Sequence, residues 1–402
     1  MNEMNISQVS TVLNEIVEQA TGQKAMASIT NAADFVSVAQ SALKTGYEPI
    51  LNAMSNVWSK TIFSSRNYNA PGDSLRMDLD QWGAATRKIS PVAMNMTNDK
   101  AFEWPVAYDA SKTPNQLGNG QSVDPWKITK QEVQQTNFYG VGVYAQRYTT
   151  FMDQFETAFA GPSEFSAFNA MNLQERSNDF ETYRENQSRL LQANYIGSLL
   201  AENQPDRVVH CITEYNSETG LTLTAKDVYK PENFAPFIRW VYAKIATVAM
   251  YMRERSLMFQ TVIDGKPVMR HTPANKLRVA MYTPIMEKIK SMVMSTTFND
   301  EYLKLMTWES VSYWQSIKTP DSISIVPTYT DTSGVLKKGS PTEKAGILAV
   351  MHDRDALGYA IVGERTLTTP INPDGAYWNT TMRAKVKTLM DMTEKGVVFL
   401  LD

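Results

Sequence analysis

The acidic side chains in the last part of the sequence have the spacing closest to that of a catalytic site. Asp353 and Asp355 flank Arg354, and Glu364 follows in the same stretch. Three carboxylates brought together could bind a divalent metal or exchange protons with a substrate. The pattern is also typical of a turn between two strands, in which an aspartate accepts hydrogen bonds from backbone amides. A metal-dependent hydrolase that uses Asp353, Asp355 and Glu364 is therefore one hypothesis, and a turn is the other.

Two glycine-containing segments have the loose spacing of nucleotide-binding loops. Residues 140–145 fit the start of the dinucleotide pattern, but they lie in a segment that alternates with period two, and no helix is expected to begin there. Residues 334–339 have the spacing of a P-loop, but Ser340 stands where the phosphate-binding lysine belongs. We expect a bent strand at the first segment and a solvated turn at the second. Neither segment predicts a cofactor.

Thiol chemistry has one candidate, because Cys211 is the only cysteine in the chain. Cys211 follows His210, and neighbouring residues on a strand point to opposite faces, so the two cannot pair within the strand expected there. One cysteine and three histidines also provide no ligand set for an all-cysteine or histidine-rich metal site. We therefore expect neither a thiol nucleophile nor an all-cysteine or histidine-rich metal centre.

The composition predicts a folded chain without a strong preference for charged partners. Of the 402 residues, 43% are apolar and 20% are charged, which is enough apolar material for a large core. The formal net charge of −3 is too small for the whole chain to bind nucleic acid or a membrane surface by charge. No apolar run approaches the ~20 residues that span a bilayer, so no membrane contact is expected.

The first third of the chain changes character near residue 65. Residues 1–65 show short stretches of helical periodicity, whereas residues 66–132 are rich in glycine and proline. Residues 75–80 alternate between apolar and polar side chains, as in a strand with one solvated face. We predict a helical arm followed by an extended excursion whose apolar side chains pack on something outside it. These side chains include Leu75, Met77, Leu79, Trp82, Phe102 and Trp104.

One segment predicts a very long helix. After a strand expected over residues 133–149, Gly161 and Pro162 precede residues 163–196, which contain no glycine or proline and would form a helix of about 50 Å. The ends of this segment are apolar and its middle is polar, which is typical of a strut over a thin layer. Gly197 and Pro205 are expected to frame its end, and its apolar C-terminal part extends to Leu199 and Leu200. Its apolar and aromatic positions include Phe165, Phe168, Phe180, Tyr183, Leu190 and Leu191.

Residues 206–365 predict a compact α/β unit. Apolar side chains recur at helical spacing over residues 234–252 and indicate an amphipathic helix. Strands are expected at residues 208–213, 277–282, 345–350 and 359–362, and a hairpin at residues 216–220. In the remainder, residues 385–392 and 397–401 are expected to pair with each other through a turn at residues 394–396.

The order of these elements resembles that of the tailed-phage major capsid proteins of the Hong Kong 97 fold. Residues 148–159, which lead into the long helix, are similar to the approach to the spine helix in capsid proteins of small short-tailed phages. Residues 347–358 resemble the strand and turn that follow the A-domain helices. Residues 372–379 and 382–389 resemble the closing run into the P-domain sheet. The similarity covers essentially the whole chain as an ordered set of segments.

This resemblance implies an α+β fold of the Hong Kong 97 type in five parts. They would be a helical N-terminal arm (1–65), an extended E-loop (66–132), a P-domain with the spine helix (133–205), an A-domain (206–365) and closing P-domain strands (366–402). Leu75, Met77, Leu79, Trp82, Phe102 and Trp104 of the E-loop would contact neighbouring subunits.

The implied function is that of a major capsid protein without catalysis or a cofactor. Many copies would assemble in the host cytoplasm into the icosahedral head shell of the virion and enclose double-stranded DNA by weak, non-specific contact. A portal protein and a scaffolding protein would be further partners. An encapsulin-type nanocompartment shell protein shares this fold and is one alternative. The metal-dependent hydrolase is an alternative of another class.

Overall fold

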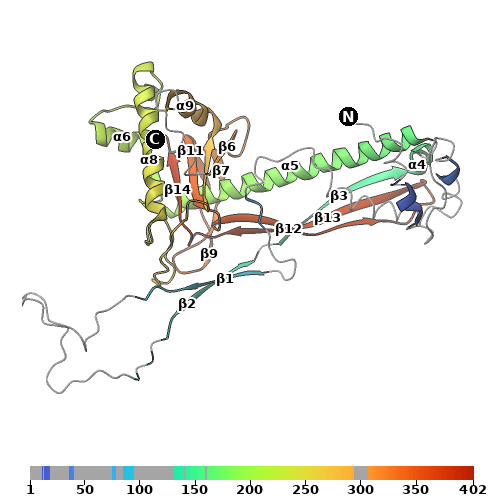
Figure 1. Cartoon of the computed structure of the whole chain (residues 1–402), viewed down its shortest axis with the longest axis horizontal. Coiled ribbons are helices and arrows are strands. Elements are labelled where there is room, and N and C mark those ends of the chain that lie inside the picture. Colours follow the sequence, from blue (N-terminus) through green and yellow to red (C-terminus); the bar gives the residue numbers. More distant parts are fainter. Residues whose placement is uncertain are drawn as a thin grey trace, which may run out of the picture.

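The computed structural model has an elongated part, built from a long helix beside a long sheet, which extends from a lobe of helices and strands (Figure 1). A thin two-stranded ribbon leaves the molecule beneath the lobe. The structure describes residues 11, 13–18, 36–39, 75–77, 85–94, 126, 128, 130–139, 141–158, 161–293 and 307–402. No helix in this part of the chain has both the length and the apolar character that crossing a membrane requires.

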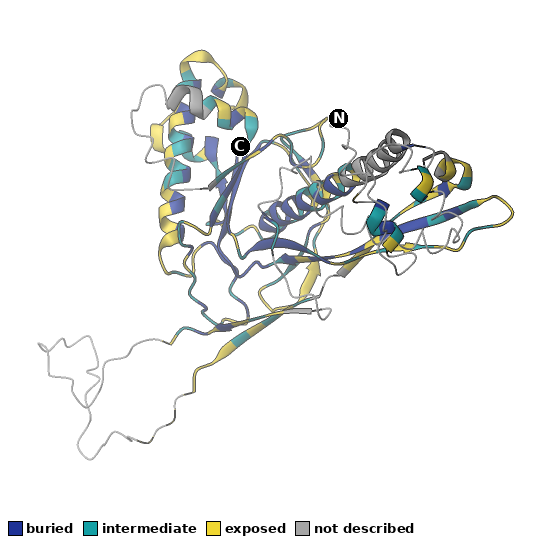
Figure 2. Cartoon of the chain, turned by 45° about the vertical axis from the view of Figure 1, so that its right-hand side comes forward, coloured by how far each residue is buried: buried dark blue, intermediate teal, exposed yellow. Residues whose placement is uncertain are grey.

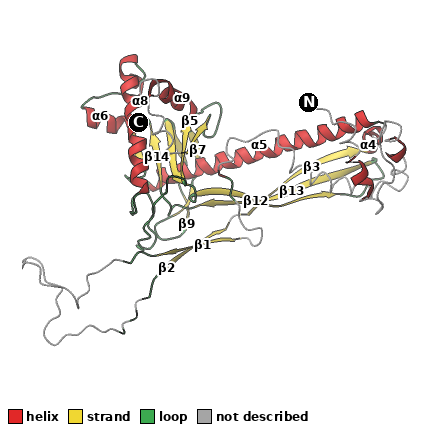
Figure 3. Ribbon diagram, in the orientation of Figure 1, coloured by secondary structure: helices red, strands yellow, loops and turns green. Residues whose placement is uncertain are grey.

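A three-stranded antiparallel sheet forms one side of the elongated part. It consists of β3 (Val141–Phe151), β12 (Leu357–Thr368) and β13 (Tyr377–Met390), in the order β12-β13-β3. The long helix α5 (Pro162–Glu202) runs beside this sheet, as Figure 3 shows. The short helix α4 (Met152–Ala158) connects β3 toward α5.

The helix α5 is longer than the sequence predicts. Its 41 residues correspond to about 60 Å, and it continues through Gly197 to Glu202. Gly197 does not stop the helix but allows a close contact, because a Cβ at this position would lie 2.8 Å from Cγ2 of Ile325. The helix ends at Asn203, which adopts a left-handed conformation and donates its backbone N–H to the carbonyl of Leu199.

Several polar side chains in the middle of α5 pack against the rest of the protein instead of being exposed to solvent. Glu181, Arg184 and Ser188 are buried there, and the Arg184 guanidinium pairs with Glu181. Toward its C-terminal end the helix becomes a core element, since Tyr195, Ile196 and Leu199 have no exposed surface. The predicted strut over a thin layer is therefore wrong for the last part of α5, which is buried.

A five-stranded mixed sheet forms the centre of the lobe. Its strands are β4 (Val208–His210), β14 (Gly396–Leu400), β11 (Ile347–Asp353), β5 (Leu277–Tyr282) and β6 (Thr307–Val311), in that order. The outer pairs β4–β14 and β5–β6 are parallel, and β11 is antiparallel to both of its neighbours.

Both faces of this sheet are covered, which explains why β11 and β14 are buried throughout. One face packs on helices α6 (Cys211–Thr219), α8 (Pro231–Arg253) and α9 (Thr283–Val293). The other face packs on the end of α5. Alternate residues of β14 serve the two faces: Val397 and Phe399 belong to the first core, and Val398 and Leu400 to the second.

Two predictions about this region are wrong. The strand expected at residues 208–213 ends at His210, and residues 211–219 form α6 instead of the start of a hairpin. Cys211, Ile212 and Tyr215 bury one face of α6, and Gly220 ends the helix with a positive φ of 72°.

The closing strands also pair differently from the prediction. β13 pairs with β12 and β3, whereas β14 pairs with β11 and β4, so residues 385–392 and 397–401 lie in different sheets. The turn expected at residues 394–396 is part of a connector between the sheets, residues 391–396. β12 continues from the turn at the end of β11 into the long sheet.

Smaller elements surround these two sheets. The helix α7 (Ala225–Val228) precedes α8, and two short antiparallel pairs lie near α5. The pairs are β7 (Ile323–Ile325) with β10 (Thr342–Lys344) and β8 (Thr328–Thr330) with β9 (Leu336–Lys338). In the N-terminal region, residues 13–18 and 36–39 are helical, and Leu13 and Ile16 are fully buried.

Candidate assembly surface

The ribbon consists of β1 (Ala85–Pro91) and β2 (Val133–Tyr139), which pair antiparallel from Ala85 opposite Tyr139 to Pro91 opposite Val133. β2 and β3 both fall in the strand predicted at residues 133–149, but they join different sheets. Residues 141–145 lie in β3, and no helix begins there, as the sequence predicts. A two-stranded ribbon has little stability alone, so its attachments to the body decide its direction.

The two faces of the ribbon differ in exposure with the period of two that a strand produces. Arg87, Ile89 and Pro91 of β1 are exposed, whereas Lys88 and Ser90 face the body. On β2, Val133 and Gln135 lie on the exposed side, which Figure 2 shows in yellow. The ribbon therefore has an inner face directed at the body and an outer face open to solvent.

Large apolar side chains are exposed on and beside this ribbon. Trp126 and Ile128 are 86% and 82% exposed, and Ile89, Met94 and Val133 are each more than half exposed. Monomeric proteins rarely present several such side chains on one thin element, and such clusters mark interaction surfaces.

Buried charges tie the inner face of the ribbon to the connector between the two sheets. The Lys88 ammonium lies 2.6 Å from Oδ2 of Asp391 and also pairs with Glu394. The Arg270 guanidinium lies 3.3 Å from Glu394 and donates to the hydroxyl of Ser90 at 2.8 Å. Two cations and two carboxylates thus form one network, which we call the root cluster.

The pKa values of the root cluster reflect burial and pairing together. Burial alone would lower the pKa of Lys88, but the charges of Asp391 and Glu394 more than offset this and raise it above its ordinary value. Burial raises the pKa of Glu394, and the charges of Lys88 and Arg270 oppose that rise.

The rest of the connector is also hydrogen-bonded and buried. Arg207, which has no exposed surface, pairs with Glu202 at 2.8 Å and donates to the carbonyls of Met392 and Gly396. Lys395 donates to the backbone carbonyl of Glu254 at 2.8 Å. The connector therefore joins the ribbon, the long helix and both sheets at one place.

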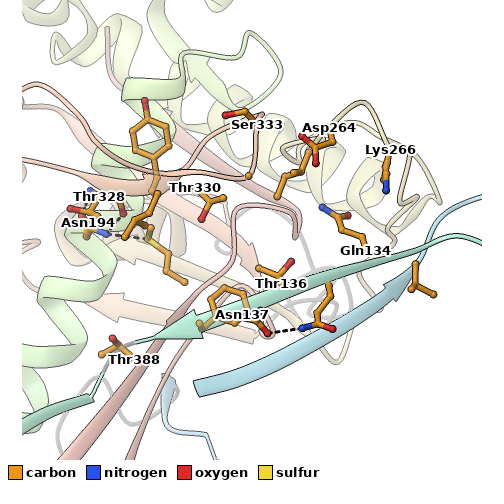
Figure 4. A pocket seen from close by; sticks show the side chains of 18 of the residues that line it. Gln134, Thr136, Asn137, Asn194, Asp264, Lys266, Thr328, Thr330, Ser333 and Thr388 are labelled. Carbon is orange, nitrogen blue, oxygen red and sulfur yellow. Dashed lines mark hydrogen bonds between the residues drawn. The ribbon is translucent and has the colours of Figure 1, made fainter. Parts of the chain in front are cut away.

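A groove of about 730 Å³ lies between the ribbon and the body (Figure 4). Gln134 and Thr136 of β2 line one side. Asn194 of α5, the β8–β9 hairpin and Thr388 of β13 line the other side. The inner face of β2 is thus not packed tightly on the body along this length.

The acidic residues that suggested a hydrolase lie in separate environments. Oδ1 of Asp353 accepts the backbone N–H of Asp355 at 2.8 Å, and the Asp355 side chain pairs with Lys276 at 2.7 Å. Glu364 lies beside Arg184 of α5. Within the described part of the chain, no three His, Cys, Asp or Glu side chains are grouped as metal ligands. The turn interpretation of Asp353 and Asp355 is confirmed.

The other residues considered for thiol chemistry or nucleotide binding lie in ordinary structural environments. Cys211 is buried at the start of α6, and burial raises the pKa of its thiol. His210 is directed at Asp402. Residues 334–339 belong to the β8–β9 hairpin, where Gly334 has a positive φ of 76° at the turn. Lys337 and Lys338 pair in strand β9, so the solvated turn expected there is wrong for these two residues.

The predicted contact residues of the excursion are only partly described. Leu75 is 2% exposed and packs in the core of its own chain, which does not favour a contact with another subunit. Met77 lies against Gly358 and donates its backbone N–H to the carbonyl of Tyr359. Leu79, Trp82, Phe102 and Trp104 lie outside the described residues.

The predicted spine residues lie on α5. Phe180 and Leu191 are buried, Tyr183 packs against Tyr144 with a ring-centroid separation of 3.9 Å, and Leu190 is half exposed. The helix includes Phe165 and Phe168, whose side chains lie outside the described part. Sequence reasoning missed the root cluster; the mostly polar residues 391–395 between two apolar strands indicated a connector but not its partner Lys88.

Comparisons with known proteins agree with this architecture. A chain from the capsid structure of Staphylococcus phage Andhra is 10% identical, with a TM-score of 0.50 over 84% of each chain. A chain from the structure of the head fiber and inner core protein gp22 of native bacteriophage P68 is 8% identical, with a TM-score of 0.50 over 83% of this chain and 85% of that one. At these identities the likeness shows the fold alone.

No curated protein gives a significant sequence match. The model of the Phi29-like phage major capsid protein family matches residues 13–400, which is nearly the whole chain. The match includes the long helix, both sheets, the ribbon and the connector that joins them. This chain therefore belongs to the Phi29-like phage major capsid protein family.

Proposed function

We propose that copies of this chain form the icosahedral head shell of a tailed phage and that the ribbon carries a contact from each copy to the next. A shell subunit needs apolar surface outside its own core. The observation that carries this proposal is the exposure of Trp126 and Ile128 on the approach to β2, together with Ile89 on β1. Repeated head-to-tail contacts of this kind build a closed shell when the geometry closes.

In this proposal the parts of the chain take the roles that the capsid fold implies. The ribbon and residues 66–132 are the E-loop, and residues 1–65 are the N-terminal arm. Helix α5 with the sheet β12-β13-β3 forms the P-domain, and the five-stranded sheet with α6, α8 and α9 forms the A-domain. The pairing of β12 with β13 supports counting β12 with the P-domain, and the pairing of β14 with β11 supports counting β14 with the A-domain, whereas the parts expected from sequence divide them differently.

The shell would enclose double-stranded DNA by weak, non-specific contact, which suits a chain with a net charge of −3. A portal protein and a scaffolding protein are the further partners, and assembly takes place in the host cytoplasm. The chain performs no catalytic step, and the separation of Asp353, Asp355 and Glu364 supports this. The family match favours a phage head over an encapsulin-type compartment.

The role of the ribbon predicts an assembly defect without loss of folding. We expect the double variant Trp126→Ser and Ile128→Ser to keep the melting temperature of the parent subunit, because both side chains are exposed, and to yield few closed particles. Light scattering and negative-stain microscopy measure the yield. The control carries Leu221→Ser and Met250→Ser, which change exposed apolar side chains on the lobe. Normal shells from the ribbon variant would contradict the proposed contact.

A further inference from the structure

Among the described residues, the ribbon has few attachments to the rest of its own chain, and this makes their chemistry important. Its outer face is exposed, and part of its inner face borders the groove of about 730 Å³. Gln134 and Thr136 point toward this groove in Figure 4. Apolar packing therefore does not hold β2 against the body along the groove, and the direction of the ribbon depends on its root.

Backbone hydrogen bonds and ion pairs meet at that root. Val92, which is buried directly after β1, donates its backbone N–H to the carbonyl of Glu132 at 2.9 Å. Ala93 donates its backbone N–H to the carbonyl of Pro267 at 2.8 Å. The ion pairs are those of the root cluster, in which Lys88 reaches two carboxylates of the connector.

Lys88 is the charged side chain by which the described ribbon enters this cluster. The side chains of Asp391 and Glu394 are 1% and 7% exposed, so their pairing with Lys88 takes place away from bulk solvent. By contrast, the pair of Lys266 with Glu132 spans 3.7 Å between exposed side chains and contributes little. Arg270 connects the cluster further to Ser90 of the same strand.

The connector itself has little freedom to follow a moving ribbon. Oδ1 of Asp391 accepts from the backbone N–H of Thr393 at 2.9 Å, and the Asp391 N–H donates to the carbonyl of Ala356 at 2.8 Å. A Cβ at Gly396 would overlap the hydroxyl of Tyr195, which places the end of the connector directly against α5. The carboxylates that receive Lys88 are therefore fixed to both sheets and to the long helix.

We propose that Lys88 is a positioning residue for assembly, which fixes the direction of the ribbon through a buried ionic contact with Asp391 and Glu394. This inference rests on the proposed role of the ribbon in contacts between subunits. The ribbon is presented to a neighbouring copy at one angle, and loss of the contact leaves the ribbon attached by its backbone but free to change direction over the groove.

The direction of the ribbon can be measured in the unassembled subunit. Cysteines placed at Asn137 on β2 and Lys385 on β13, both exposed, accept spin labels for distance measurement by pulsed electron paramagnetic resonance. The native Cys211 is buried and its thiol has a raised pKa, so it does not compete for the label.

Three variants of the labelled protein distinguish the effect of the Lys88 charge from the effect of a local change in packing. Lys88→Met removes the charge and keeps the length of the side chain, whereas Lys88→Arg keeps the charge. Arg87→Met is the matched control, because Arg87 is the exposed neighbour on the same strand. The combination of Lys88→Met with Glu394→Gln replaces Lys88→Met if the single variant does not fold, since it removes one cation and one carboxylate and leaves the net charge of the cluster unchanged.

We expect Lys88→Met to broaden and shift the distribution of distances between the labels and to reduce the yield of closed shells. Lys88→Arg keeps the distance distribution and the yield of closed shells of the parent protein, and Arg87→Met changes neither quantity. An unchanged distance distribution in Lys88→Met, or in its combination with Glu394→Gln, would overturn the positioning role. A broadened distribution with a normal yield of shells would instead overturn the proposed contact role of the ribbon and leave the positioning role intact.

Discussion

Lys395 carries an ammonium group into the joint between the two sheets, where it has no exposed surface. Its Nζ atom donates to the carbonyl of Glu254 and to the hydroxyl of Ser256, both at 2.8 Å, and lies over the ring of Phe259. Burial lowers the pKa of Lys395 from 10.5 to about 8, although the charge of Glu254 opposes this change. The folded subunit therefore releases this proton at a lower pH than the unfolded chain.

This difference predicts a pH dependence of stability with a definite sign. Between about pH 8 and about pH 10 the unfolded chain still holds the Lys395 proton while the folded chain loses it, so the free energy of unfolding rises with pH, by about 2 kcal/mol from this group. Chemical denaturation of the unassembled subunit, compared with Lys395→Met over the same range, isolates the effect. A difference between the two proteins that stays constant with pH would contradict it.

Single residues were the level at which the sequence was least informative. The acidic turn at Asp353 was predictable from local chemistry, because an aspartate that binds the backbone two residues later needs no distant partner. The root cluster was not predictable, because Lys88 and Glu394 lie 306 positions apart in the sequence. Only the fold brings such residues together.

At the scale of elements, α5 illustrates how packing overrides a local signal. Residues without glycine or proline predicted the helix, and Gly197 with Pro205 was expected to frame its end, since glycine is a poor helix former. The helix continues through Gly197 to Glu202, and at Gly197 the absence of a Cβ leaves room for Ile325 of β7 and Pro327. The same limit applies to residues 385–401, where two strands adjacent in sequence enter different sheets.

The close approach predicts that Gly197→Ala destabilises the subunit although it improves helix propensity. Alanine gains about 1 kcal/mol of propensity, but its Cβ would meet Ile325 at 2.8 Å, and overpacking costs about 1–3 kcal/mol. We expect a net loss in the free energy of unfolding by urea denaturation. Adding Ile325→Ala to Gly197→Ala should cost less than the sum of the single changes. A more stable Gly197→Ala subunit would show that the contact is not restrictive.

At the scale of the whole molecule, the order of elements was the most predictable feature. A long helix, an excursion and an α/β lobe in this order predicted the capsid fold, and the family match over residues 13–400 confirms it. The direction of the ribbon was not predictable, since it depends on contacts between β1 and the connector near the other end of the chain.

If this chain builds a closed shell, its state of assembly in solution shows it directly. The measurement is negative-stain microscopy with light scattering on the recombinant protein, prepared with and without the scaffolding and portal proteins of the same phage. We predict closed isometric particles of uniform diameter in at least one of the two preparations. Monomers or dimers that persist in both preparations would contradict the claim.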